Sequence, residues 1–320
     1  MHARTQLKGA AILLITALIW GTSFVAQSLG MEVIEAFTYN GIRSLMGAAA
    51  LVPFILVRDK VLARSLTPAA LAAKKIADKK LLPYGLILGC VFCVASNFQQ
   101  FAFYHSTAGK IAFITALYMF FTPFFGLFIG KRVSRITWIC TVFGIIGLYF
   151  LSIDPQEFAA SGGGIAGFLR TVNRGDLQAL ACAAVYGVHI LCVEKFSAEV
   201  DGVKLSCLQF LPAGLISCGL MFLFENPDPR GIRLALGPLL YSGLMSCGIA
   251  YTLQIIGQKY TEATLASILM CMESVFAVLA AALFLHERLT GRELLGCVIM
   301  FAAILLSQGA EALANKKANA

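Results

Sequence analysis

The sequence has few charged residues for its length. Charged residues make up 13% of the 320 residues, whereas 59% are hydrophobic and the mean hydropathy is +0.81. A soluble chain carries roughly 45–50% apolar and 25% charged residues. So much apolar surface with so few charges excludes an ordinary water-soluble domain and requires a lipid solvent.

Several motifs of enzyme sites are also missing. The sequence has no Gly-x-x-x-x-Gly-Lys-Ser/Thr phosphate loop, no His-Glu-x-x-His and no Gly-x-Ser-x-Gly. The first absence argues against ATP hydrolysis by this chain. The other two argue against the metal-dependent and serine-dependent hydrolases that carry those motifs. We therefore expect no enzymatic activity, no cofactor and no metal.

Ten cysteines are present, and all lie inside apolar stretches. A cysteine in such a place behaves as a small hydrophobic residue. Cys90-x-x-Cys93 has the spacing of a redox motif, but it lies within a predicted helix with no second pair or nearby histidine. We interpret the cysteines as packing residues.

Ten apolar stretches are long enough to cross a bilayer as helices, which takes about 20 residues each. They cover residues 9–29, 36–57, 82–104, 108–129, 136–153, 176–196, 204–224, 236–258, 263–285 and 292–310. The first is too long for the core of a cleavable signal peptide, so we expect it to be retained. The sequence predicts an all-α polytopic membrane protein with ten transmembrane helices.

Lysine and arginine are concentrated in every second loop between the predicted spans. With the N-terminus placed inside, 17 of the 25 basic residues lie in inside segments and seven in outside segments, with Arg43 within a span. Basic connections stay cytoplasmic, so we expect both termini in the cytoplasm, in a bacterial inner membrane. The basic loop expected at 58–80 has almost no aromatic residues, which argues against nucleic-acid binding.

The two halves of the sequence resemble each other. At shifts of 154 to 166 residues, the matches include Trp20-Gly21 with Tyr186-Gly187, Arg43 with Gln209, and Gln100 with Gln254. Each half has five predicted spans, an odd number, so the second copy must be inverted in the membrane. We predict a first repeat at 1–153, an outer linker loop at 154–174 and a second, inverted repeat at 175–320.

Inverted repeats are recurrent in secondary transporters, whose substrate site lies near the bilayer midplane between the two repeats. The alternative is a duplication that only builds a stable bundle.

Two ionisable residues inside spans are the first candidates for a site, because a charge at a helix centre costs roughly 2.5–3.5 kcal/mol on insertion scales. Glu273, halfway along its span, could bind a proton or an amino group. Arg43 presents a planar guanidinium that suits a carboxylate or a phosphate. The structural alternative for each is a hydrogen bond or an ion pair between helices, including a pair with each other.

Other polar and aromatic side chains in the spans are candidates for a cavity wall. His189 could relay protons, because histidine changes charge near neutral pH, although packing is its commoner role. Each polar residue could equally hold two helices together by hydrogen bonds. The wall candidates are Trp20, Ser23, Gln27, Tyr186, His189, Gln209 and Gln254, with Asn97, Gln99, Gln100 and Tyr118 as further possibilities.

The repeat and its residues resemble the drug/metabolite transporter superfamily, specifically its EamA-type branch. The resemblance rests on Trp20 to Phe24, Arg43, Ala108 to Thr115 followed by Pro123, Ala263 to Ser267 through Glu273, and His286 to Thr290. It covers nearly the whole chain. Two residues depart from the family: Ser274 stands where a proline is frequent, which predicts a less kinked helix, and Lys131 where a glutamate is common.

The resemblance implies a central cavity open to one side at a time, through which such proteins move amino acids, related metabolites or drugs. We therefore expect a secondary transporter of small polar or amphipathic metabolites that works by alternating access. We expect an exporter coupled to protons, monomeric or homodimeric. The alternatives are an importer or an uncoupled facilitator and, more remotely, a non-transporting membrane enzyme or scaffold.

Overall fold

The computed structural model describes residues 2–65, 67–131, 133–152, 160, 173–284 and parts of 290–306. Within these ranges the chain is helical and has no strand. Most of the linker predicted at 154–174, the motif at 286–289 and part of the last predicted span lie outside the described residues.

The helices follow one another along the chain without any other type of element in the described ranges. The first half contains α1 (His2–Met31), α2 (Ala36–Ser65), α3 (Pro68–Ala102), α4 (Ala108–Ala116), α5 (Tyr118–Phe128) and α6 (Arg135–Ser152). The second half contains α9 (Arg174–Ser197), α10 (Gly202–Phe224), α11 (Pro229–Leu234), α12 (Leu236–Leu240), the π-helix η1 (Tyr241–Ala250), α13 (Tyr251–Gln258), α14 (Ala263–Met270) and α15 (Met272–Phe284).

Helical stretches long and apolar enough to cross a membrane confirm the predicted fold class. Seven of them are Leu7–Met31, Lys75–Ala102, Ala108–Phe128, Arg174–Ser197, Gly202–Phe224, Leu236–Gln258 and Ala263–Phe284. Two shorter apolar helices, Arg135–Gly147 and Leu294–Ala303, and the 30-residue α2 stand at the remaining predicted spans. The protein is an all-α, multi-pass integral membrane protein.

The basic stretch at 58–80, expected as a loop, is mostly helical. Helix α2 continues to Ser65, and α3 already begins at Pro68. Thr67 caps α3 by accepting a hydrogen bond from the Ala70 amide at 3.3 Å. Proline suits the first turn of a helix, and alanine, leucine and lysine are strong helix formers. The charges therefore indicated exposure to water correctly, but they did not indicate an irregular backbone.

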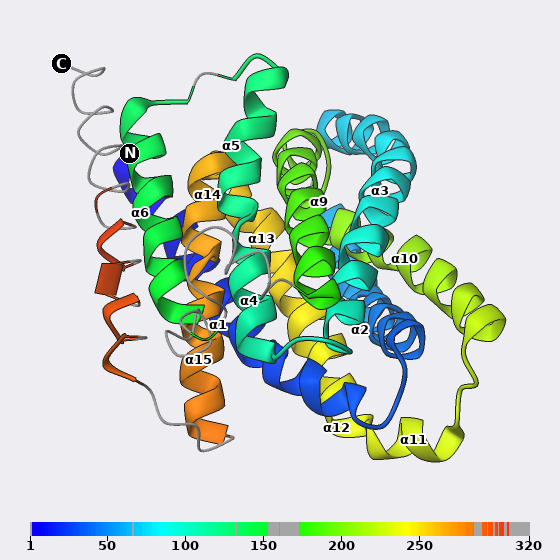
Figure 1. The fold of residues 1–320 in the computed structure, drawn as a ribbon. Coiled ribbons are helices and arrows are strands. Elements are labelled where there is room, and N and C mark those ends of the chain that lie inside the picture. Colours follow the sequence, from blue (N-terminus) through cyan, green and yellow to red (C-terminus); the bar gives the residue numbers. More distant parts are fainter. Residues whose placement is uncertain are drawn as a thin grey trace.

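Figure 1 shows the helices as one bundle, in which α11 and α12 join the ends of α10 and η1. Helix α1 packs against α14, α15, η1 and α13, whereas α9 packs against α3, α4, α5 and α13. Helix α2 packs against α10 and η1. Because α1 and α9 each contact elements from the other half of the chain, they form the walls of the space between the halves.

Glycine allows α1 and α9 to approach their neighbours closely. A methyl group at Gly21 of α1 would lie 2.5 Å from Cβ of Phe276 and 2.6 Å from the carbonyl oxygen of Glu273. A methyl group at Gly187 of α9 would lie 2.8 Å from Cβ of Phe121 in α5. The two glycines matched in the sequence thus have the same role, each bringing its helix against an interrupted helix pair.

Helices α2 and α10 run antiparallel. At one end, the Glu225 carboxylate after α10 accepts hydrogen bonds from the backbone amides of Phe37 and Thr38 at 2.7 Å each. At the other end, Arg58 pairs with Asp201 at 2.9 Å. Carboxylates are favourable at helix N-termini, so Glu225 stabilises the start of α2.

Further ion pairs surround the Arg58–Asp201 contact. Lys204 pairs with Asp59 at 2.8 Å and with Asp78 at 2.9 Å. Nearby, Lys80 donates a hydrogen bond to Glu199 at 2.6 Å and thereby lowers the pKa of the Glu199 carboxyl. We refer to Arg58, Asp59, Asp78, Asp201 and Lys204 as the Arg58–Asp201 cluster. It ties the C-terminal end of α2 to the N-terminal half of α3 and to the N-terminal end of α10.

Replacing Gly21 with alanine is expected to destabilise the protein. The added methyl group overlaps Phe276 and backbone atoms of α15, and overpacking of this kind costs about 1–3 kcal/mol. Thermal unfolding of the detergent-purified protein measures the change. Gly219→Ala in α10 is the matched control, because a methyl group there meets nothing within 4 Å. Equal melting temperatures for both variants would contradict the close packing of α1 on α15.

Candidate functional site

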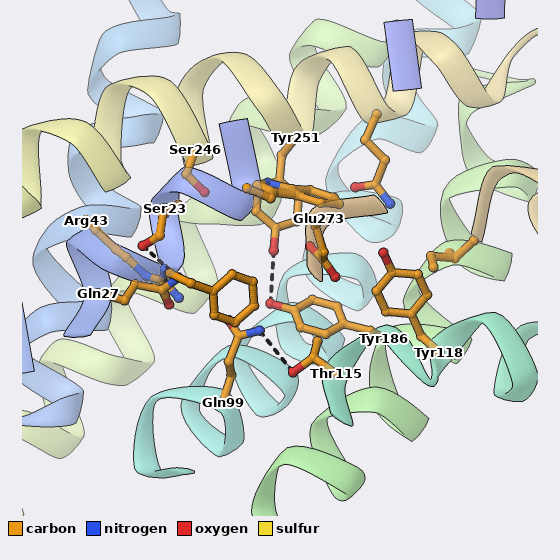
Figure 2. Close-up of a pocket in the computed structure, with 14 residues that line it drawn as sticks. Ser23, Gln27, Arg43, Gln99, Thr115, Tyr118, Tyr186, Ser246, Tyr251 and Glu273 are labelled. Carbon is orange, nitrogen blue, oxygen red and sulfur yellow. Dashed lines mark hydrogen bonds between the residues drawn. The ribbon is translucent and has the colours of Figure 1, made fainter. Parts of the chain in front are cut away.

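A pocket lies among α1, α2, α3, α4, α5, α9, η1, α13 and α15 (Figure 2). Its lining is Trp20, Ser23, Phe24, Gln27, Arg43, Gln99, Thr115, Tyr118, Tyr186, Ile190, Ser246, Tyr251, Gln254 and Glu273. The free space at its centre is ≈ 30 Å³. On this measure one water needs about 10–15 Å³, so the space holds about two water molecules. A metabolite would require the surrounding helices to separate.

Seven of the nine predicted site residues line this pocket, namely Glu273, Arg43, Trp20, Ser23, Gln27, Tyr186 and Gln254. Gln99 and Tyr118, named as further possibilities, line it as well. His189 and Gln209 do not line it. Asn97 instead bonds Ser217 of α10 at 3.0 Å, so it connects two helices rather than facing the pocket.

Arg43 is held in the pocket by a neutral partner. Its Nη1 donates a hydrogen bond to Oε1 of Gln27 at 3.0 Å, and its guanidinium lies over the ring of Tyr39, 5.6 Å from the centroid. The side chain is 3% exposed. Arg43 forms no ion pair with any acidic residue that the structure describes. The pocket therefore contains a buried positive charge that forms no ion pair with a described residue.

Glu273 lies just after a break in the helix. Helix α14 ends at Met270, the chain turns at Cys271, and Glu273 occupies the first turn of α15. The first turn of a helix favours a negative charge. Glu273 is 3% exposed and also forms no ion pair with a described residue. The break occurs with Ser274 at the position where proline is frequent in the family, so proline is not required for it.

Tyr118 lies near Glu273 and belongs to the second interrupted helix pair, α4 and α5. It is the first residue of α5, directly after the break at Leu117. Its hydroxyl points towards the Glu273 carboxylate (Figure 2). Within the described residues, the hydroxyl and Oε1 of Glu273 both lack a hydrogen-bond partner of good geometry. Both groups are therefore available to a ligand or a proton.

Aromatic rings form one wall of the pocket. Trp20 packs on Tyr251 with ring centroids 4.6 Å apart, and the hydroxyls of Tyr251 and Tyr186 are hydrogen-bonded at 2.9 Å. Phe24 also lines the pocket. Aromatic faces accept apolar groups and also attract cations. The wall thus suits the organic part of a small amphipathic molecule.

Several polar atoms of the lining have no hydrogen-bond partner among the described residues. They are Trp20 Nε1, Ser23 Oγ, Arg43 Nε, Tyr118 Oη, Gln254 Oε1 and Glu273 Oε1. Buried polar groups in native proteins are nearly always hydrogen-bonded, so these atoms are positioned to bind water or a polar ligand in the pocket. Gln99, in contrast, donates a hydrogen bond to Thr115 at 3.4 Å.

His189 and Gln209 form a separate polar pair. Nε2 of His189 lies 3.0 Å from Oε1 of Gln209, and both side chains are fully buried. The rings of Phe92, Tyr186 and Tyr251 surround the imidazole at centroid distances of 6.0 to 6.1 Å. Tyr186 and Tyr251 thus lie between this pair and the pocket that they line.

The sequence analysis did not name five of the lining residues as wall candidates, namely Phe24, Thr115, Ile190, Ser246 and Tyr251. Tyr251 precedes Gln254 by three residues, so helical spacing could have placed both on one face. Ser246 lies in the π-helix η1, whose rotation per residue differs from that of an α-helix, so α-helical periodicity gave no signal. In the described part of the chain, no group of three or more metal-binding side chains gathers.

The model of the EamA-like transporter family matches residues 7–153 and 173–308. The chain belongs to the EamA-like transporter family. This confirms the resemblance found in the sequence, and the protein is a membrane transporter of the drug/metabolite transporter superfamily.

Two curated relatives align over most of the chain. A probable amino-acid metabolite efflux pump from Escherichia coli (strain K12) is 24% identical over 324 residues, covering 94% of each chain. An uncharacterized transporter from Archaeoglobus fulgidus is 23% identical over 295 residues, covering 92% of this chain and 83% of the relative. A crystal structure 18% identical to this chain has the same fold, with a TM-score of 0.71 over 94% of this chain and 96% of that one.

Removing the acceptor for Arg43 is expected to destabilise the transporter. Gln27→Leu leaves the buried guanidinium without its partner, and hydrogen bonds to charged groups contribute about 1.5–3 kcal/mol. Gln27→Glu is the matched control, since it keeps the acceptor and adds an opposite charge. Thermal unfolding of the purified variants measures the difference. A Gln27→Leu protein as stable as Gln27→Glu would show that another group holds Arg43.

Proposed function

We propose that this transporter exports small amino-acid-like metabolites by alternating access. The observation that carries the proposal is the pair of opposite charges in the pocket. Arg43 and Glu273 are both buried, and neither is paired with an opposite charge from the described chain.

A zwitterionic substrate would satisfy both charges at once. Its carboxylate would accept hydrogen bonds from Arg43, a geometry that the planar guanidinium favours. Its ammonium group would bind the Glu273 carboxylate, and its side chain would pack on Trp20 and Tyr251. An unpaired buried charge is costly, so a ligand that supplies the counter-charges gains free energy. The similarity to a probable amino-acid metabolite efflux pump from Escherichia coli supports this substrate class.

Interrupted helices around the pocket support a conformational cycle. The breaks at Leu117 and Cys271 and the π-helix η1 all adjoin residues that line the pocket. Discontinuous helices at a midplane site are typical of transporters with inverted repeats. We propose that the repeats at 1–153 and 175–320, joined by the linker at 154–174, move against each other at these breaks. We also propose that the protein lies in a bacterial inner membrane with both termini on the cytoplasmic side.

Glu273 is the proposed coupling residue. When the substrate ammonium leaves, the carboxylate loses its counter-charge in a low-dielectric site, where the protonated form is favoured. Proton uptake at one face and release at the other would then couple export to the proton gradient. The alternatives are an importer or an uncoupled facilitator, which share the site and differ in what drives the flux.

Substitution of Glu273 is expected to abolish most of the export. Cells expressing the parent, Glu273→Gln, Arg43→Gln or an empty vector are compared by metabolite profiling of medium and cytosol. Losing a hydrogen bond to a charged group costs about 1.5–3 kcal/mol, so substrate affinity should fall about 10- to 100-fold. Glu262→Gln, an exposed residue before α14, is the matched control and should export like the parent. Parent-like export by both site variants would refute the site assignment.

A second prediction concerns the driving force. In liposomes containing the purified parent, an imposed proton gradient should accelerate efflux of the substrate identified by profiling. Glu273→Gln should show the same residual flux with and without the gradient, because glutamine cannot take up the proton. Flux of the parent that ignores the gradient would favour the uncoupled facilitator.

A further inference from the structure

His189 and Gln209 repeat, in the second half of the chain, the arrangement of Gln27 and Arg43. In each case one hydrogen bond of 3.0 Å joins a long helix to the next long helix along the chain. Gln27 lies on α1 and Arg43 on α2, whereas His189 lies on α9 and Gln209 on α10. Arg43 and Gln209 each lie seven residues after the first residue of their helix.

The two pairs lie towards opposite ends of the bundle. In the antiparallel pair of α2 and α10, Gly41 packs on Cys218 and Leu45 on Gly214, so Arg43 lies level with about residue 216 of α10. Gln209 therefore lies about seven residues, roughly 10 Å, further towards the other end. Arg43 is near the end where Glu225 accepts hydrogen bonds from the start of α2. Gln209 is near the end held by the Arg58–Asp201 cluster, since Asp201 caps α10.

The first pair is open to the pocket, and the second is closed off. Gln27 and Arg43 line the pocket, together with Gln99 and Thr115 from the same end of the bundle. His189 and Gln209 are separated from that space by the hydrogen-bonded Tyr186 and Tyr251 and are fully buried. The conformation is therefore asymmetric between the two ends.

The closed pair has unused hydrogen-bonding capacity. Nδ1 of His189 and Nε2 of Gln209 have no partner among the described residues, although both side chains are 0% exposed. An unpaired buried polar atom costs free energy, and native structures contain few of them. Apolar packing residues would fill the same space without this cost. The arrangement is explained if another conformation gives these atoms partners.

We propose that His189 and Gln209 form a substrate subsite of the opposite-facing state, as the counterpart of Gln27 and Arg43. The subsite opens when the Arg58–Asp201 cluster separates. The Gln209 amide donates to the substrate carboxylate, and Nδ1 of His189 accepts from its ammonium or hydroxyl group. Bonds from a neutral amide are weaker than those from a guanidinium, so the substrate is held less tightly at this face. The proposal rests on the proposed transport function.

State-dependent accessibility tests the subsite without any substrate. Gln209→Cys and Gln27→Cys, one residue from each pair, are treated with a membrane-impermeant maleimide in right-side-out and in inverted vesicles. Mass spectrometry of the separated peptides distinguishes labelling at these positions from labelling of the native cysteines. Arg58→Ala is added as a second background, because it removes the pair with Asp201 and favours opening at that end.

We expect Gln27→Cys to be labelled from one face and Gln209→Cys from the opposite face. Arg58→Ala should raise labelling at 209 several-fold and lower it at 27. If the cysteine at 209 stays unlabelled in both vesicle orientations and both backgrounds, or is labelled from the same face as 27, the proposal is overturned. These outcomes are independent of whether any metabolite is exported, so they separate the subsite from the transport proposal.

Transport from each face provides a second readout that a purely structural role would not give. With the substrate found by profiling, Gln209→Leu should raise the Michaelis constant at the face near the Arg58–Asp201 cluster at least fivefold. At the other face the Michaelis constant should stay within twofold of the parent value. Gln209→Asn, which keeps the amide, should raise the constant much less than Gln209→Leu does. Equal changes at both faces would indicate a structural role and overturn the proposal.

Discussion

The buried charge of Arg43 is the constraint on which the rest of the site depends. A guanidinium cannot lose its charge in a protein, so its surroundings must compensate for the lost water. Gln27 and the ring of Tyr39 do this in part, and no described acid completes it. The bundle is therefore arranged around a positive centre that no described side chain neutralises by an ion pair. Gly21 packs α1 against the backbone of Glu273 in α15, and Glu273 and Arg43 line the same space without forming an ion pair.

Much of this could be predicted from the sequence, because charges and aromatic residues are rare and conspicuous in apolar helices. Arg43, Glu273 and Trp20 were found in this way, and all three line the pocket. His189 and Gln209 were predicted to line the cavity on the same grounds, but they do not line it. Whether a polar residue reaches a cavity depends on the packing between helices, which the pattern within one helix does not encode. Ser246 was missed because a π-helix breaks the α-helical period.

The two ends of the bundle are held together by different kinds of interaction. At the Glu225 end, a carboxylate is held by backbone amides, which keep their position whatever the side chains do. At the other end, side chains hold side chains through several exchangeable ion pairs. These side chains are only partly exposed to water, but such ion pairs near the surface contribute little individually and are weakened by salt, so the second end is the easier one to separate.

Helix α2 is longer than the membrane requires. Its 30 residues extend about 45 Å, whereas the hydrocarbon core is about 30 Å thick. About three turns therefore project into water at its C-terminal end, and α3 begins its 35 residues beside them. A helix that tilts inside the bilayer moves its projecting end further than its buried centre. Because Arg58 and Asp59 pair with Asp201 and Lys204, a tilt of α2 would be transmitted at this end directly to α10.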